Sequence, residues 1–94
     1  MNGYKITGIN FKNKYMKHEL KTWVEFFEDI LNGNKKFEIR KADRDFQVGD
    51  ILVLKEFHNN TLEYSGREIN KIVTWIMKGG KFGHEEGYLV MSIE

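Results

Sequence analysis

The sequence predicts an α+β fold: a small, partly closed β-barrel of about five strands with one helix packed near its opening. Three observations lead to this expectation. One segment in the first third of the chain carries apolar residues at helical spacing, and the segments after it are short alternating or β-branched runs bounded by turn residues. The chain has 94 residues, 40% of them hydrophobic, which suffices for one modest core and a single domain.

The helix is predicted over residues 22 to 33, TWVEFFEDILNG. Thr22 and Glu25 have the spacing of a capping box, which predicts the start of the helix. Gly33 is expected to end it in the left-handed conformation. The apolar residues between them recur on one helical face, and we expect this aromatic-rich stripe to pack against a sheet. Its members are Trp23, Phe26, Phe27, Ile30 and Leu31.

Residues 35 to 42, KKFEIRKA, alternate between polar and apolar side chains, as a β-strand does. We expect Phe37 and Ile39 to face the core and anchor the strand. Glu38 and Arg40 then share the opposite, polar face.

Further strands are expected along the chain. Residues 51 to 57, ILVLKEF, begin with a continuous apolar run, which is typical of a strand buried on both faces. The other expected elements are a strand over residues 68 to 77, a strand over residues 88 to 93, turns at Asn59-Asn60 and Ser65-Gly66, and a glycine-rich loop over residues 78 to 87. A strand over residues 16 to 21 could precede the helix.

Composition and charge exclude several classes of protein. Lys and Arg number 15 and Asp and Glu 14, and this near-zero net charge argues against bulk electrostatic coating of nucleic acid while leaving a local basic patch open. Without cysteine there is no disulfide or thiolate metal site, and the three histidines lack ligand spacing, so neither metal nor cofactor is expected. No segment resembles a secretory signal or approaches the ~20 apolar residues of a membrane span, so a cytoplasmic protein without a membrane partner is expected.

The candidate ligand-binding surface is the charged run over residues 33 to 50, GNKKFEIRKADRDFQVGD. Such a run usually forms a solvent-facing ladder of paired charges. Here it follows the predicted helix, where the chain turns back over the sheet and a concave surface is expected. Arginine offers a planar donor fork, lysine a compact cation and glutamate an acceptor for amines. Lys35, Glu38 and Arg40 could therefore recognise a base and its phosphate.

Aromatic side chains that could stack on a base lie near this run in sequence, namely Trp23, Phe46 and Phe82. Trp23 belongs to the apolar stripe of the helix, so we expect it in the core. In the glycine-rich loop, Lys81 and Phe82 could face a ligand held at the mouth of the barrel.

Residues 18 to 57 and 64 to 93 resemble a small ASCH-type domain of the PUA-like superfamily, and more narrowly its branch of short, often phage-encoded proteins. The resemblance rests on the motif G-x-K-[TK]-x-E-x-R at residues 33 to 40, followed by [FV]-x-x-G-D at residues 46 to 50. It covers roughly residues 16 to 94 and leaves residues 1 to 15 as an N-terminal extension.

The resemblance implies a barrel with a cleft between its first helix and the strands, proposed to bind RNA or a nucleotide. By motif position, Lys35, Glu38 and Arg40 line this cleft, and Lys21 and the aromatic-rich end of the helix lie beside it. We therefore expect an RNA- or nucleotide-binding module in which the cations contact phosphate or base and Glu38 reads an amine. Lys41 and Arg44 extend the basic rim.

Two alternatives stay open. Some ASCH relatives hydrolyse the amide of acetylated cytidine; their catalytic Lys falls on Lys35, but their Thr falls on Glu38. The resemblance thus implies a small hydrolase of a modified nucleoside or RNA as an alternative, with Lys35 stabilising an oxyanion and Glu38 acting as general base. In the other alternative the charges only pair with one another and the protein serves a partner protein.

Overall fold

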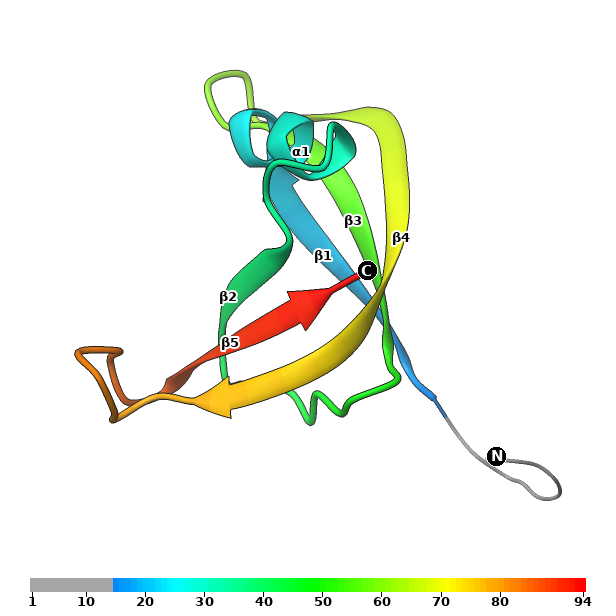
Figure 1. Cartoon of the computed structure of the whole chain (residues 1–94). Helices are drawn as coiled ribbons and strands as arrows, with labels where there is room; N and C mark the ends of the chain where they lie inside the picture. Colours follow the sequence, from blue (N-terminus) through cyan, green and yellow to red (C-terminus); the bar gives the residue numbers. More distant parts are fainter. Residues whose placement is uncertain (1–14) are drawn as a thin grey trace, which may run out of the picture.

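The computed structural model describes residues 15 to 94, and it forms a five-stranded mixed sheet with one short helix (Figure 1). The predicted extension, residues 1 to 15, lies outside the described residues except for Tyr15. The elements in chain order are β1 (Lys17–Trp23), α1 (Val24–Leu31), β2 (Phe37–Lys41), β3 (Ile51–His58), β4 (Glu63–Lys78) and β5 (Tyr88–Ile93). The α+β class, the expected number of strands and the strand before the helix are confirmed.

The strands lie in the order β1-β3-β4-β5-β2, with β1 parallel to β3 and every other pair antiparallel. The 16-residue strand β4 pairs with β3 through its first part and with β5 through its second part. Its register shifts between Val73 and Trp75, and the sheet bends there. No backbone ladder joins β1 to β2 within residues 15 to 94, so the strands form a rolled sheet that is open between these two edges, and closure into a barrel is not shown.

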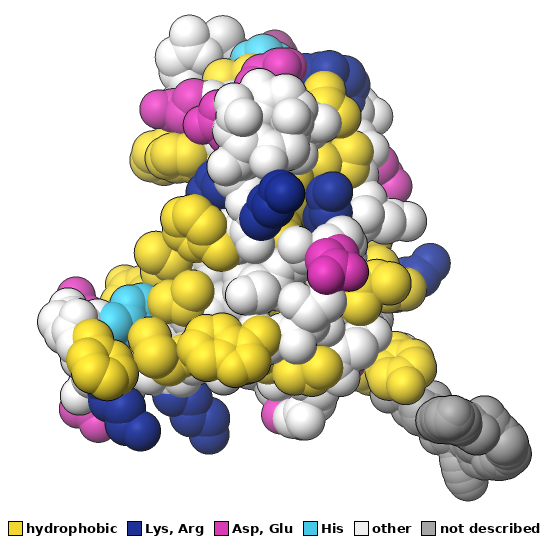
Figure 2. Space-filling view, viewed as in Figure 1, with side chains coloured by type: hydrophobic (Ala, Val, Ile, Leu, Met, Phe, Trp, Pro, Cys, Tyr) yellow, Lys and Arg dark blue, Asp and Glu magenta, His cyan; other side chains and the backbone are white. Residues whose placement is uncertain are grey.

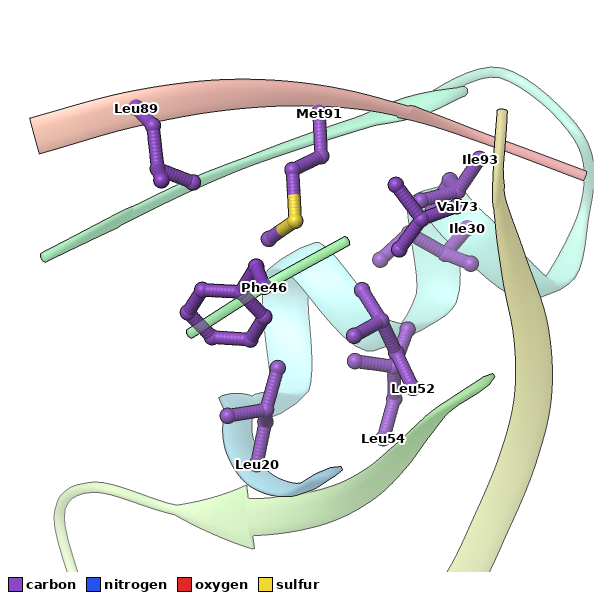
Figure 3. Close-up of a cluster of buried hydrophobic side chains, with 9 residues drawn as sticks. All are labelled: Leu20, Ile30, Phe46, Leu52, Leu54, Val73, Leu89, Met91 and Ile93. Atoms are coloured by element: carbon purple, nitrogen blue, oxygen red, sulfur yellow. The ribbon is translucent and has the colours of Figure 1, made fainter. Parts of the chain in front are cut away.

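The hydrophobic core fills the space inside this rolled sheet (Figure 3). As predicted, β3 is buried on both faces, because its consecutive residues Leu52, Val53 and Leu54 are all buried. The core cluster combines residues from four strands, the helix and the segment before β3: Leu20, Ile30, Phe46, Leu52, Leu54, Val73, Leu89, Met91 and Ile93.

The F-x-x-G-D motif before β3 has a structural role. Phe46 is part of the core, with its ring centroid 4.6 Å from that of His18. Asp50 is buried and accepts hydrogen bonds from the ring Nε2 of His18 at 2.7 Å and from the backbone N–H groups of Met16 and Gln47. Burial by itself raises the pKa of Asp50, but these hydrogen bonds outweigh it and hold the pKa below its ordinary value.

The helix begins later than the sequence predicts. The predicted N-cap, Thr22, is instead the last inward-facing residue of β1, and it is 2% exposed. Trp23 occupies the N-cap position and makes no side-chain capping bond. The C-terminal prediction is confirmed, because Gly33 follows the helix with φ of 85° and donates its N–H to the carbonyl of Ile30.

The apolar stripe of α1 is only partly buried. Phe27 and Ile30 lie in the interior, and the guanidinium carbon of Arg67 lies 5.0 Å from the centroid of the Phe27 ring. The other members of the predicted stripe are exposed: Trp23, Phe26 and Leu31. The eight-residue helix therefore presents aromatic side chains to solvent. No helix within residues 15 to 94 is long and apolar enough to cross a membrane.

The predicted turn at Ser65-Gly66 is wrong, because both residues belong to β4. Gly66 has φ of 95°, and the opposite strand shifts its register between Lys55 and Phe57. The glycine thus allows an irregularity within a paired strand instead of a chain reversal. The predicted glycine-rich loop does connect β4 to β5.

In that loop, Gly79 is expected to tolerate no side chain. A Cβ atom built at Gly79 lies 1.9 Å from the backbone carbonyl oxygen of Glu85, and backbone cannot move aside cheaply. We expect Gly79→Ala to lower the free energy of unfolding by about 2 kcal/mol through overpacking. Urea unfolding measures the change, with exposed Glu86→Ala as the control within the same loop. Equal stability of the two variants would contradict the prediction.

Candidate functional site

A pocket of about 450 Å³ opens between the end of β1, the start of α1 and β2. Its polar lining includes Lys35, Glu38 and Arg40, the three residues that the family resemblance implies to line a cleft. Aromatic and aliphatic side chains surround them. The complete lining is Lys21, Thr22, Trp23, Phe26, Lys35, Phe37, Glu38, Ile39 and Arg40.

The aromatic lining is accessible to solvent. The rings of Trp23 and Phe26 stack on each other, with centroids 6.1 Å apart and planes 16° from parallel. Trp23 is 46% exposed and Phe26 42%, so the expectation that Trp23 belongs to the core is wrong. Phe37 from β2 adds a third ring to the lining.

Strand β2 has the alternation that the sequence predicts but the opposite orientation. Glu38 is 3% exposed, whereas Phe37 is 42% and Ile39 51% exposed. In the sheet register Glu38 lies opposite buried Met91. The expectation that Phe37 and Ile39 anchor the strand in the core is therefore wrong. Paired cations explain why the carboxylate can face inward, because they compensate the cost of its burial.

Glu38 is held between two cations. Its Oε2 accepts a hydrogen bond from Lys35 Nζ at 2.7 Å, and its Oε1 accepts one from Arg40 Nε at 2.9 Å. Lys35 also donates to the backbone carbonyl of Phe37 at 2.7 Å, which fixes the ammonium group at the wall of the pocket. The side chains of Lys35 and Arg40 remain 18% and 23% exposed, whereas that of Glu38 is 4% exposed. The charges thus pair with one another inside a pocket instead of forming a flat ladder.

Arg40 also connects the two open edges of the sheet. Its Nη2 donates to the backbone carbonyl of Lys21 at 3.0 Å and to Thr22 Oγ1 at 3.3 Å, both on β1. A side chain of β2 therefore bridges the gap that backbone pairing leaves open. Lys21 contributes this carbonyl, while its Nζ lies 4.3 Å from the centroid of the Phe57 ring.

The pocket has an excess of positive charge. Lys35 and Arg40 together carry two positive charges, and Glu38 neutralises one of them. Within the described part of the chain, Arg40 Nη1 donates no hydrogen bond to another residue, so the guanidinium keeps donors that a ligand could engage. The arrangement suits an anionic group placed next to a flat or apolar one.

Three predicted ligand-binding residues do not line this pocket. Lys41 is exposed at the end of β2, and Arg44 is exposed in the segment after it. Phe82 is 93% exposed in the loop between β4 and β5. Their proposed contacts with a ligand stay predictions. No group of three or more His, Asp or Glu residues within residues 15 to 94 is placed to hold a metal ion.

Three lining residues were not predicted as part of a site: Thr22, Phe37 and Ile39. Local patterns assigned Thr22 to the helix cap and the other two to the core. Alternation places Phe37 and Ile39 on the face opposite Glu38 and Arg40, but it does not say which of the two faces points outward. If the two charged residues pair inside the fold, the apolar ones must face outward.

The sequence of nearly all the described residues matches a known protein family. A family model described as a domain of unknown function, DUF3850, matches residues 17 to 93. An uncharacterized 12.9 kDa protein in the GpA 3′ region of Escherichia phage P2 is 35% identical over 57 residues. That alignment covers 61% of this chain and 50% of the phage protein, so it spans about half the length of this relative.

Proposed function

This chain belongs to the DUF3850 family, and we propose that the pocket between β1, α1 and β2 binds RNA or a nucleotide. The observation that carries the proposal is the combination of an exposed aromatic stack, Trp23 with Phe26, and the two cations Lys35 and Arg40 in one pocket. The resemblance to ASCH-type domains, whose cleft is proposed to bind such ligands, supports the same function.

The lining matches the two parts of a nucleotide. A nucleobase is flat and stacks on aromatic side chains, and Trp23 and Phe26 expose ring surface for it. A phosphate needs cationic donors, which Lys35 and Arg40 supply. A volume of about 450 Å³ also lies within the range of small-molecule sites.

Glu38 positions the cations in this proposal. Because each of its carboxylate oxygens already accepts a hydrogen bond from a cation, it fixes Lys35 and Arg40 before a ligand arrives. The hydrolase alternative needs Glu38 as a general base on water. Both of its oxygens are engaged, so the geometry favours binding over catalysis.

Tryptophan fluorescence can test binding at this pocket, because the chain has two tryptophans and only Trp23 lines it. In a Trp75→Phe background, Trp23 is the sole tryptophan reporter. We expect saturable quenching by 5′-mononucleotides (AMP, CMP, GMP, UMP) or by a short single-stranded RNA. Calorimetric titration of the unsubstituted chain measures the affinity without interference from the light that nucleotides absorb.

Lys35→Gln should weaken this binding about tenfold, the effect of losing a contact worth about 1.4 kcal/mol. With a mononucleotide as the ligand, Lys36→Gln is the matched control, because Lys36 is exposed, adjacent and absent from the pocket lining. If neither mononucleotides nor RNA bind, or if the two variants weaken binding equally, the pocket is not the site.

A further inference from the structure

The outer face of β2, β5 and the second part of β4 carries exposed and half-buried apolar side chains. Figure 2 shows a band of hydrophobic side chains over the region where Figure 1 places β5 and the end of β4. The register places Phe37 opposite Ser92 and Ser92 opposite Trp75, so the two aromatic residues lie in one row on the same face. Phe37 is 42% and Trp75 53% exposed.

The next row of this face continues the pattern. Ile39 lies opposite Val90, and Val90 lies opposite Met77. Helix α1 packs on β1 and β3, away from this half of the sheet. An antiparallel sheet normally presents polar side chains on its solvated face, and an extended apolar face marks a binding surface.

This sheet face is continuous with the proposed nucleotide pocket. Phe37 and Ile39 belong to both, since they line the pocket and also begin the two rows on the sheet. An extended ligand that leaves the pocket over β2 therefore contacts Phe37 first and Trp75 two strands further on. Two strand spacings correspond to roughly 10 Å.

The charge along β2 favours an anionic chain as the occupant. Lys35, Lys36, Arg40 and Lys41 lie on or directly before β2. The strand has one carboxylate, Glu38, which is buried and already paired. Basic side chains beside exposed rings are the combination with which proteins hold single-stranded nucleic acid.

We propose that the face formed by Phe37, Ile39, Trp75, Met77 and Val90 extends the pocket into a platform for a single-stranded polynucleotide. One nucleotide occupies the pocket, and bases that follow it in the strand stack on Phe37 and Trp75. The inference rests on the proposed function of the pocket and adds that the ligand is a strand instead of a free nucleotide.

The dependence of affinity on strand length tests this platform. Single-stranded oligonucleotides of about two, four and eight residues are compared with a mononucleotide by calorimetric titration. Affinity should rise with length, and Trp75→Ala should lower the affinity for the longest strand about tenfold, as the loss of one stacking contact does. Tyr64→Ala is the matched control, because Tyr64 is an equally exposed aromatic residue of β4 outside this face.

A second measurement distinguishes binding on the sheet face from binding in the pocket. In a Trp23→Phe background, Trp75 reports on the sheet face alone, and it should be quenched by the longest strand but not by a mononucleotide. If Lys35→Gln weakens binding while affinity is independent of length and Trp75→Ala has no effect, the pocket stands and the platform is overturned. The platform is also overturned if Trp75→Ala converts a dimer to a monomer without changing the affinity for the strand.

Discussion

Glu38→Ala is expected to lower the free energy of unfolding by about 3 kcal/mol, because it leaves two cations without their shared partner. In the folded protein, Lys35 and Arg40 both bind this buried carboxylate. Without it they repel each other in a partly buried site. Domains of this size have a total stability of roughly 5 to 10 kcal/mol, so the variant is expected to be close to unfolding at moderate temperature.

Urea unfolding at neutral pH measures this loss, and two further variants make it interpretable. Glu38→Gln keeps the shape and one acceptor oxygen, so it should lose less stability than Glu38→Ala. Glu19→Ala is the control for removing a carboxylate from a surface pair, because Glu19 and Lys55 are 3.3 Å apart with side chains 70% and 36% exposed. That pair should be worth less than about 1 kcal/mol. Similar losses in Glu38→Ala and Glu19→Ala would show that the buried pairing contributes little.

The consequences of losing Glu38 should extend to the edges of the sheet. Arg40 is oriented by Glu38 and in turn donates to Lys21 and Thr22 on β1. Since no backbone ladder joins β1 to β2 within residues 15 to 94, these side-chain bonds connect the two edges. We therefore expect faster amide hydrogen exchange in β1 of Glu38→Gln than in β1 of the unsubstituted protein.

Strong local patterns in the sequence predict most elements of this fold. The continuous apolar run of β3 predicts its burial, because no polar residue interrupts it. The left-handed Gly33 is predicted because a helix commonly ends on glycine. Thr22 and Ser65-Gly66 have equally clear local signals, yet they belong to strands. In both cases pairing with β3 overrides the local preference. Thr22 pairs with Glu56 of β3, and Gly66 lies where the register between β3 and β4 shifts.

The orientation of β2 could not be predicted from alternation. A period of two separates Phe37 and Ile39 from Glu38 and Arg40 but does not say which set faces inward. The usual preference for buried apolar residues gives the wrong answer here. What decides is a contact between residues far apart in sequence, Arg40 with the end of β1, which no local pattern contains. The same contact brings the charged triad and the aromatic residues of α1 into one pocket.

The second large effect on the free energy of unfolding is expected from Glu56, whose ionised carboxylate should stabilise the folded protein down to acid pH. Glu56 is 3% exposed on β3 and accepts hydrogen bonds from Arg67 Nε at 3.0 Å, Arg67 Nη2 at 2.9 Å and Ser65 Oγ at 2.6 Å. The hydrogen bonds from Arg67, followed by that from Ser65, lower the pKa of Glu56 from its ordinary 4.5 to about 2, although burial opposes the shift. Arg67 also pairs with Glu28 of α1, so the same guanidinium joins the helix to the sheet.

The direction of the pH dependence follows from the lowered pKa. In the unfolded chain Glu56 takes up a proton near pH 4.5, whereas in the folded protein it stays ionised down to about pH 2. Its contribution is therefore complete above pH 4.5 and is lost as the pH falls toward 2. A full shift of this size corresponds to about 3 kcal/mol, and since the Arg67 side chain is half exposed, solvent screening reduces the expectation to about 2 kcal/mol.

Urea unfolding at several pH values between 7 and about 2.5, on the unsubstituted chain and on Glu56→Gln, isolates this contribution. The unsubstituted protein should lose stability with falling pH more steeply than Glu56→Gln, because the amide does not titrate. Asp50, whose pKa is also lowered, titrates in both proteins and cancels in the comparison. Glu63→Gln, an exposed position on β4, is the matched control and should follow the unsubstituted protein. Parallel pH profiles for Glu56→Gln and the unsubstituted protein would mean that Arg67 and Ser65 do not hold Glu56 ionised.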